Sequence, residues 1–269
     1  MMINTKNLCP IEFASLIRIG RANDGGYVIP AEIFSISDGL LSYGINKDWS
    51  FEKDFWKNNP KAHIHCYDHS VNFYSLIIFT IKSFFLSIIH LLLLDKKRLS
   101  KVFYGLFVIP NYYSFFRQKR IYFKNKIWYN NYGINKTVED SLSKIYKSGA
   151  RNIFLKMDIE TAEYLVLNDI FKTNKNIIGM AIEFHKIDEF TEQFNSTINE
   201  ILKKHHIVHI HGNNYGKLIE EINFPSILEI TFLNKKYVKG PIKKSTKKYP
   251  VKDLDQPNRA SKEDYNLIF

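Results

Sequence analysis

Titratable side chains follow three apolar segments of this chain, at the points where strands are expected to end. Asp158 and Glu160 follow RNIFLKM, Glu183 and His185 follow IIGMAI, and His211 ends IVHIH. Because the carboxyl ends of parallel strands meet at one edge of an open α/β sheet, we expect these groups to share a site. Carboxylates and a histidine at such an edge can remove a proton from a hydroxyl or bind Mg²⁺ or Mn²⁺.

Two chemical roles are open to this set of side chains. As the base, His185 is the first candidate, because an unperturbed pKa of about 6.5 suits proton removal near neutrality. Asp158 and Glu160 complete the catalytic set, and Asp158 could instead act as the base without a metal. The expected metal ligands are Asp158, Glu183 and His211. The structural alternative is that Asp158 and Glu160 cap the following helix and that His211 satisfies buried backbone groups.

The elements that must position these groups alternate between strand and helix. Thr137, with Asp140 three residues later, suits a helix start, and Gly149 suits its end. The alternation predicts a mostly parallel, twisted, Rossmann-like α/β sheet with helices on both faces, in one domain spanning 1–269. We expect strands at 40–44, 62–68, 151–157, 177–183, 206–211 and 226–233, and helices at 50–58, 137–149, about 161–172 and about 189–204.

A nucleoside-binding half-site is expected at the start of this sheet. Gly44 ends the first strand, and Asp68 ends the next one, 24 positions later. A glycine there lets the backbone approach a ligand, and the acid can accept both ribose hydroxyls. YGINKDWS lacks the GxGxxG pattern that holds a pyrophosphate, which disfavours NAD. A cofactor without phosphate, such as S-adenosylmethionine, is favoured.

A long apolar insertion, 71–116, interrupts the alternation. Its segment 73–94, FYSLIIFTIKSFFLSIIHLLLL, has the length and hydropathy of a membrane span, interrupted by Lys82 and His90. A single span would place the two halves of one sheet on opposite sides of a bilayer. We therefore expect helices that cap the acceptor cleft or pair two subunits in a homodimer. A helix on the membrane surface is the alternative.

Composition indicates the partners and the compartment. The net charge of +11 predicts an anionic partner, with lysine bias as the alternative. The basic segment 235–248 lacks the aromatic interleaving of nucleic-acid readers, so no nucleic acid is expected. Cys9 and Cys66 show neither disulfide nor zinc spacing, and no apolar leader is visible. These features predict the cytoplasm, including the inner face of the membrane.

Several blocks of the sequence together resemble one family. RIGRANDGGYVIP, LLSYGINKDWSFE, the strand end YD, LKMDIETAEY, IEFH and DLDQPNRASKEDYNLIF are similar to the FkbM-type S-adenosylmethionine-dependent methyltransferases. More narrowly, the blocks resemble bacterial members from surface-polysaccharide (capsule) gene clusters, over roughly 12–70 and 135–269. The resemblance implies a Rossmann-like methyltransferase fold. It also implies O-methyl transfer to a sugar hydroxyl, with a nucleotide-activated sugar or a related molecule as acceptor.

The resemblance also implies which residues bind the cofactor. Gly44 and Asp48 match the cofactor loop, and Asp68 matches the ribose acid. Thr161 departs from the family pattern, which has a glycine at that place (DIEGAE). The N-terminal block that closes over the cofactor supplies the remaining contacts, namely Arg18, Asp24, Gly25, Gly26 and Tyr27.

Some residues near these blocks are expected to serve the fold. Glu163 and Tyr164 are assigned to the helix start and the core, and Arg18 and Tyr27 have packing as their alternative role. Two other functions stay open for the whole chain: a nucleotide-sugar-modifying enzyme of another reaction type, and a catalytically silent scaffold protein. Five other histidines are expected on strands or helix surfaces: His63, His65, His205, His206 and His209.

Overall fold

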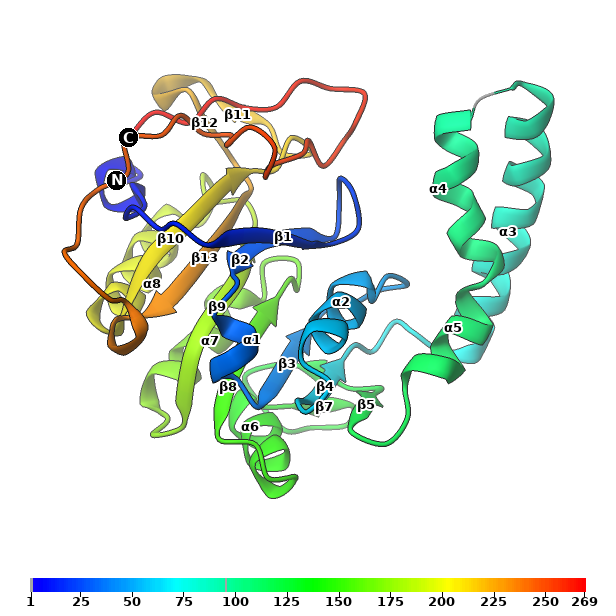
Figure 1. The fold of residues 1–269 in the computed structure, drawn as a ribbon, viewed down its shortest axis with the longest axis horizontal. Helices are drawn as coiled ribbons and strands as arrows, with labels where there is room; N and C mark the ends of the chain where they lie inside the picture. Colours follow the sequence, from blue (N-terminus) through cyan, green and yellow to red (C-terminus); the bar gives the residue numbers. More distant parts are fainter. Residues whose placement is uncertain (1, 95) are drawn as a thin grey trace.

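The computed structural model describes residues 2–94 and 96–269, without the side chains of 96–98, 100 and 101. Figure 1 shows a central sheet with helices on its faces and a helical arm projecting from one edge. The strands of the central sheet are β3 (Gly39–Tyr43), β4 (His63–Tyr67), β5 (Arg120–Phe123), β8 (Asn152–Met157), β9 (Asn176–Phe184), β10 (His205–Gly212) and β13 (Leu228–Asn234).

The order of the strands is β10-β13-β9-β8-β3-β4-β5. Strands β9, β8, β3, β4 and β5 are parallel, and β13 runs antiparallel between β9 and β10. Numbered along the chain, the sheet reads 3-2-1-4-5-7-6, which is the Rossmann order with an antiparallel strand inserted before the last one. The predicted mostly parallel α/β sheet is confirmed. Its topological switch point lies between β3 and β8.

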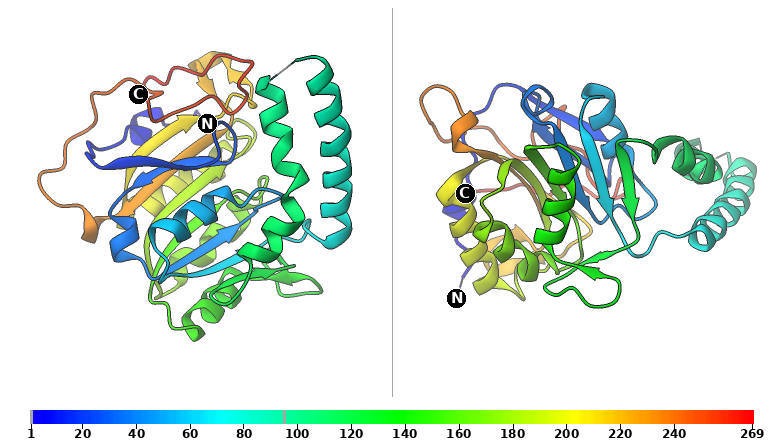
Figure 2. Two further views of the ribbon diagram at one scale, coloured as in Figure 1. Left: turned by 45° about the vertical axis from the view of Figure 1, so that its right-hand side comes forward. Right: turned by 90° about the horizontal axis from the view of Figure 1, so that it is seen from below.

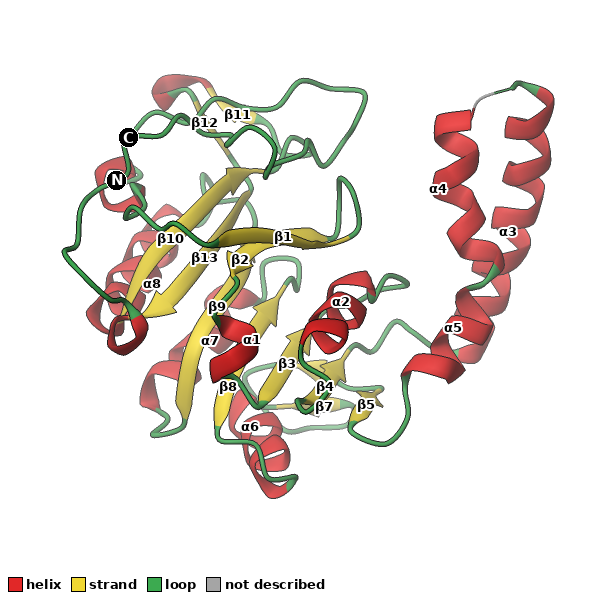
Figure 3. Cartoon of the chain, in the orientation of Figure 1, coloured by secondary structure: helices red, strands yellow, loops and turns green. Residues whose placement is uncertain are grey.

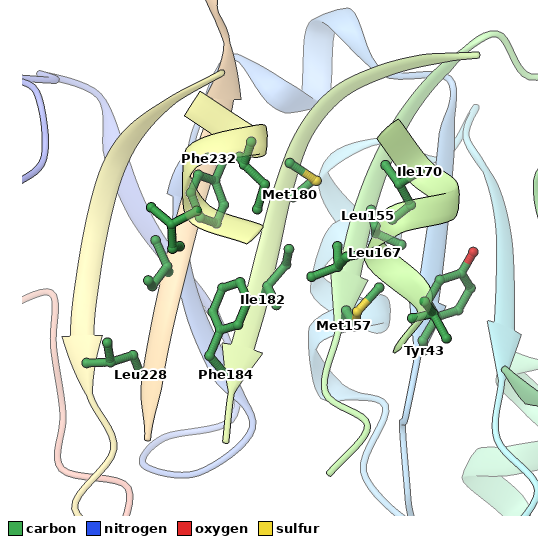
Figure 4. Packing of buried hydrophobic residues seen from close by; sticks show 14 of the residues in the cluster. Tyr43, Leu155, Met157, Leu167, Ile170, Met180, Ile182, Phe184, Leu228 and Phe232 are labelled. Carbon is green, nitrogen blue, oxygen red and sulfur yellow. The ribbon is translucent and has the colours of Figure 1, made fainter. Parts of the chain in front are cut away.

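Helices cover both faces of the sheet, as Figure 3 shows. On one face lie α6 (Val138–Lys147), α7 (Glu163–Lys172) and α8 (Thr191–Lys204). On the other lie α1 (Ile33–Ile36), α2 (Ser50–Asn58) and the hairpin of β1 (Leu16–Gly20) and β2 (Gly26–Pro30). Figure 4 shows the first layer, in which Leu167 and Ile170 of α7 pack against Leu155 and Met157 of β8.

The starting residues of α6 and α7 have local physical causes. The expected capping box of α6 is confirmed, because Thr137 accepts a hydrogen bond from the Asp140 N–H and Asp140 accepts one from the Thr137 N–H. Helix α7 begins at Glu163, later than expected. Glu160 and Thr161 have φ values of 54° and 75°, which a right-handed helix excludes.

The apolar insertion folds as helices between β4 and β5. α3 (Phe73–Leu92) and α4 (Lys96–Leu106) form the projecting arm, hereafter the α3–α4 hairpin, and α5 (Val108–Phe115) returns to the sheet. The right-hand view of Figure 2, like Figure 1, shows this hairpin projecting beyond the edge of the sheet. Its base is anchored by Val108 and Phe115, which are buried in the core beside α2.

The chain after β13 runs along the strand ends and carries little regular structure in its described part. Isolated bridges join Ile11 to Lys244 and Tyr249 to Leu267. The basic segment is therefore partly tied to the fold. The other short elements are η1 (Thr5–Leu8), β6 (Lys126–Ile127), β7 (Asn135–Lys136), β11 (Leu218–Ile219), η2 (Glu220–Ile222), β12 (Phe224–Pro225) and η3 (Lys235–Tyr237).

Candidate active site

The exits of β3 and β8 touch at the switch point. Gly44 follows β3 with a φ of +74°, and a Cβ there would lie 1.7 Å from the main-chain oxygen of Asp158, which follows β8. A side chain at this position would clash with backbone, so glycine is required. Glycine at this position thus allows the two strand exits to touch, in addition to leaving room for a ligand.

A cavity of about 1020 Å³ opens over these strand ends. Switch-point crevices at the carboxyl ends of strands are the usual ligand sites of such sheets. The cavity is lined by most of the residues expected from the sequence: Asp24, Gly25, Gly44, Asp48 and Asp68 of the cofactor set, and Asp158, Glu160, Glu183 and His185 of the catalytic and metal sets.

Arg18 and Gly26, expected to contact the cofactor, are not among the described residues that line the cavity. The Arg18 guanidinium donates to the Asn23 carbonyl oxygen at 2.5 Å. A Cβ on Gly26 would lie 2.9 Å from the same guanidinium. These two residues therefore shape the turn that presents Asp24 and Gly25 to the cavity.

Asp68 lies in the cavity wall with its carboxylate already engaged. Its Oδ2 accepts the N–H groups of Ile45 and Asn46 at 3.0 and 2.7 Å. Its Oδ1 accepts both the N–H and the hydroxyl of Ser70, each at 2.7 Å. A carboxylate has about four acceptor positions, so a ribose hydroxyl must displace one of these bonds. The rotatable Ser70 hydroxyl is the partner most easily displaced.

Asp48 joins the glycine turn to the start of α2. Its Oδ1 accepts the Ser50 N–H at 3.0 Å, and its Oδ2 lies 3.6 Å from the Arg21 guanidinium. A Cβ on Gly25 would lie 3.0 Å from that same Oδ2. Asp48 thus holds the N-terminal turn against the loop after β3, at the cavity wall.

Three carboxylates surround the outer nitrogen of His185. Its Nε2 lies 3.7 Å from Asp158, 3.6 Å from Glu160 and 3.6 Å from Glu183. Its Nδ1 lies 3.1 Å from Oε1 of Glu163, which also accepts the His185 main-chain N–H at 2.8 Å. One ring nitrogen is therefore anchored to a buried acid, and the other lies among the acids of the cavity.

Glu163 has a role that the sequence did not indicate. It lies at the helix start as expected, but its fully buried carboxylate orients His185. Tyr164 also supports this residue, because its hydroxyl donates to the His185 carbonyl oxygen at 2.8 Å. An acid in a first helical turn is commonplace, so the role of Glu163 can be recognised only from its burial against His185.

The charge state of His185 differs from expectation. Burial alone would lower its pKa, but the hydrogen bond to Glu163 and the charges of Glu183, Glu163 and Asp158 raise it to about 9. The expectation of an ordinary pKa was wrong, because the chain brings four carboxylates around one ring. At neutral pH the ring is an imidazolium. Burial and the Asp158 charge, in turn, raise the pKa of Glu183 well above its usual value.

The alternative role of Asp158 and Glu160 as helix caps does not hold. Helix α7 has Ala162 as its N-cap, without a side-chain hydrogen bond. The side chains of Asp158 and Glu160 are 31% and 87% exposed. Both carboxylates therefore remain accessible from the cavity.

His211 belongs to a different cluster, so the prediction that it shares a metal with Asp158 and Glu183 was wrong. Its Nδ1 lies 3.2 Å from Glu229, and its Nε2 lies 2.8 Å from Asp264. Strand β13 separates β9 from β10, which places their ends roughly 9–10 Å apart at the usual strand spacing. The described group whose ligand atoms all lie within 4.8 Å of one another is Asp158, Glu183 and His185.

Two polar residues of the site, Lys156 and Asn213, gained no role from the sequence, and a third, Tyr27, has another role than expected. Lys156, a lone charge within β8, donates to the Gly44 carbonyl oxygen at 2.6 Å and lies 3.9 Å from Asp158. Asn213 donates to Oε1 of Glu183 at 2.7 Å. The buried Tyr27 hydroxyl, expected at the cofactor, donates instead to Glu183 at 3.1 Å from beneath the cavity wall. Of these three findings, the sequence could have indicated only that of Lys156, because a lysine inside an apolar strand is unusual.

The cavity is acidic although the chain is basic. Of the described residues that line it, seven are Asp or Glu and four are Lys or Arg. The whole chain has 38 Lys and Arg against 27 Asp and Glu. Burial lowers the pKa of Lys156, yet Asp158 and Glu52 outweigh burial and raise it. Acidic side chains still outnumber cationic ones when the His185 imidazolium is counted, which favours a positively charged ligand.

Comparisons with known proteins add little to this geometry. No protein-family model matches the sequence, and no curated protein matches it. Among solved structures, a chain of a fibrillarin/Nop5p complex aligns with a TM-score of 0.34 and 12% identity, over 73% of this chain and 72% of that chain. A TM-score this low does not establish a common fold. The fold assignment therefore rests on the strand order given above.

Proposed function

We propose that this protein is an S-adenosylmethionine-dependent O-methyltransferase. Its acceptor would be a hydroxyl of a sugar or sugar-linked group in capsule or surface-polysaccharide biosynthesis. The observation that carries the proposal is the acidic cavity at the switch point of a Rossmann-like sheet. A sulfonium cofactor is cationic at sulfur and has no phosphate. It suits this wall better than a dinucleotide does.

The residues of the cavity fit the parts of this cofactor. S-adenosylmethionine would supply an electrophilic methyl group on a positively charged sulfur. Asp68 would accept a ribose hydroxyl in place of the Ser70 hydroxyl, and Asp24 and Gly25 would close over the cofactor from the N-terminal turn. Asp158 and Glu183 would balance the positive charge. The inserted antiparallel strand also agrees with the methyltransferase fold that the sequence resemblance implies.

His185 would take the proton of the acceptor hydroxyl at Nε2. In the free protein this nitrogen carries a proton, because the surrounding acids raise the pKa to about 9. A cation bound beside Asp158 and Glu183 lowers that pKa, since like charges disfavour the imidazolium. Glu163 would hold the ring through Nδ1 and stabilise the imidazolium that forms on proton transfer.

A divalent ion is the competing occupant of the same place. Asp158, Glu183 and His185 offer two carboxylates and an imidazole, a set that accepts Mg²⁺ or Mn²⁺. Because Glu163 engages Nδ1, His185 would have to ligate the ion through Nε2 and could not accept a proton there, so we propose transfer without a metal. Exhaustive chelation followed by Mg²⁺ or Mn²⁺ addition separates the two, because only a metal-dependent reaction stops and resumes.

Calorimetry tests the cofactor assignment. S-adenosylmethionine and its demethylated product should bind, and NAD should not. Asp68→Ala should weaken binding by about 1.5–3 kcal/mol, the scale of hydrogen bonds to a charged group. Ser70→Ala is the matched control, because it removes only the competing hydroxyl and should leave affinity equal or higher. Unchanged affinity in Asp68→Ala would remove Asp68 from the cofactor site.

The acceptor is identified by transfer of labelled methyl groups. The protein is incubated with labelled cofactor and a panel of nucleotide-activated sugars, and the products are separated and counted. Label in a sugar hydroxyl supports the acceptor class. Cofactor binding without transfer to any sugar would leave a methyltransferase of another class, and absence of cofactor binding would favour a silent scaffold.

A further inference from the structure

Helix α3 has an inverted distribution of polar and apolar side chains. It packs against α4. Beside Phe79, the side that faces α4 carries small or polar residues. Ser83 is buried at this contact, where a Cβ on Gly105 would lie 1.9 Å from the Ser83 hydroxyl. Thr80, Ser87 and His90 continue the same side of the helix and are partly buried. A helix of a water-soluble fold usually turns its apolar side inward.

The outward side of α3 is apolar over a wide arc. Its large apolar residues are 42–77% exposed along most of the helix. Only 11% of its 18 most apolar consecutive residues are buried. At about 100° per residue, the exposed positions cover roughly 220° of the circumference. A stripe that packs on another protein element is typically about 100° wide. The residues concerned are Ile81, Phe84, Phe85, Leu86, Ile88, Ile89, Leu91 and Leu92.

Basic residues adjoin this apolar surface in the sequence. The segment 95–101, DKKRLSK, which follows α3 and enters α4, contains four basic residues and one acid. Lys82 is exposed within the apolar arc, toward one edge of it, and its long side chain can reach a headgroup from there. Clustered Lys and Arg beside an apolar helix face are typical of binding to anionic lipids.

The topology excludes a span and allows contact with one face of a bilayer. Strands β4 and β5, which flank the hairpin in the chain, are parallel neighbours in one sheet. Both ends of the hairpin therefore stay on the same side. The four basic residues of 95–101 also make passage of the turn through the hydrocarbon core costly.

We propose that the α3–α4 hairpin docks on an anionic membrane surface, with the outward side of α3 in the acyl region of one leaflet. The basic residues that follow α3 in the sequence supply the charge that favours an anionic surface. Phe79 of α3 contributes to the cavity wall, so docking places the cavity beside the membrane. The proposal rests on the hairpin alone and does not depend on methyl transfer.

A second copy of the chain is the occupant that the observations disfavour. A symmetric pair through α3 would bring together two chains that each carry a net charge of +11. It would also leave uncovered much of an arc roughly twice as wide as one packing stripe. A lipid surface surrounds an apolar arc of this width and offers opposite charge.

Vesicle co-sedimentation of the full chain tests the proposal. Wild type should bind phosphatidylcholine vesicles that contain phosphatidylglycerol and bind pure phosphatidylcholine more weakly. The variant Phe85→Glu/Leu92→Glu changes two residues near the centre of the arc, 60% and 77% exposed, and should lose at least about tenfold in partitioning. The control Ile242→Glu/Ile268→Glu changes residues 58% and 73% exposed elsewhere, with the same change of charge, and should bind like wild type.

Thermal unfolding of both variants should match wild type, because the altered side chains make few contacts. Equal loss of binding in both variants would show that net charge alone acts, and it would overturn insertion of α3. A stable dimer that Phe85→Glu/Leu92→Glu dissociates, in a protein that ignores anionic vesicles, would overturn the membrane in favour of a second copy. Equal binding to neutral and anionic vesicles would overturn the role of the basic residues in 95–101.

Discussion

His185 and His211 occupy similar chemical settings near the ends of β9 and β10. Each ring has a carboxylate near both of its nitrogens. Burial opposes protonation of both rings, but the hydrogen-bonded acids raise the pKa of His185 to about 9 and that of His211 to about 10. Both are therefore cations at neutral pH.

The two sites differ in what lies on the outer nitrogen. At His185 the acids near Nε2 include Glu160, which is 87% exposed at the cavity. At His211, Nε2 is held by Asp264 of the C-terminal segment, which is 13% exposed. The same kind of charged histidine can thus serve a reaction where a cavity reaches it and fasten the chain where a segment covers it. Access, rather than residue type, separates the two roles.

The largest effect is expected at the open site. The side chain of the His185→Gln variant cannot accept a proton, so methyl transfer to an acceptor identified by the labelling experiment should fall roughly 10²–10⁴-fold. Cofactor affinity measured by calorimetry should stay within a few-fold, because the ring is assigned to the proton and not to the cofactor. Undiminished transfer in this variant would show that Asp158 or another group is the base.

The covered site should respond in stability instead. His211→Gln leaves Glu229 and Asp264 without their cation, and loss of one partner of a buried ion pair costs about 3–5 kcal/mol. Urea denaturation measures the free energy of unfolding. Where the variant is folded, its cofactor affinity should match wild type. A stability loss below about 1 kcal/mol would mean that the C-terminal segment is held without this contact.

The contribution of the same contact to the free energy of unfolding should depend on pH. The folded pKa of His211 is about 10, and the unfolded value is about 6.5. The folded state therefore holds the proton more tightly. This contribution is fully present below about pH 6.5 and is lost as the pH rises through 10. His185 acts with the same sign, so the measured quantity is the difference between wild type and His211→Gln. That difference should shrink between pH 7 and 10; a constant difference would contradict the assignment.

The smallest effect is expected at Thr161, in the turn between β8 and α7 that borders the cavity. Thr161 has a φ of 75°, a left-handed conformation that is strained for a β-branched residue. Thr161→Gly should raise the free energy of unfolding by about 1 kcal/mol, because glycine adopts this conformation without strain. Thr173→Gly, at an ordinary φ of −76°, is the control and should not stabilise. A destabilised Thr161→Gly variant would show that the threonine side chain contributes more than its backbone costs.

The sequence by itself determined the parts of the protein that depend on neighbouring residues. The apolar runs, the capping box of Thr137 and Asp140 and the glycine after β3 each have a local physical cause, and each was predictable. The parallel pairing of β3, β4, β8 and β9 followed from the alternation of strands and helices. It brought Asp68, Asp158 and Glu183 to one cavity.

Only the tertiary structure decided which of these residues share a neighbourhood. Insertion of β13 between β9 and β10 moved His211 away from Asp158, and the burial of Glu163 under His185 raised the pKa of that ring. The polar side of α3 faces α4 and its apolar side faces outward, which hydropathy alone could not show. These features depend on contacts between distant segments. Strand order and helix orientation are set by the packing of the whole chain, whereas local patterns specify only the elements that are packed.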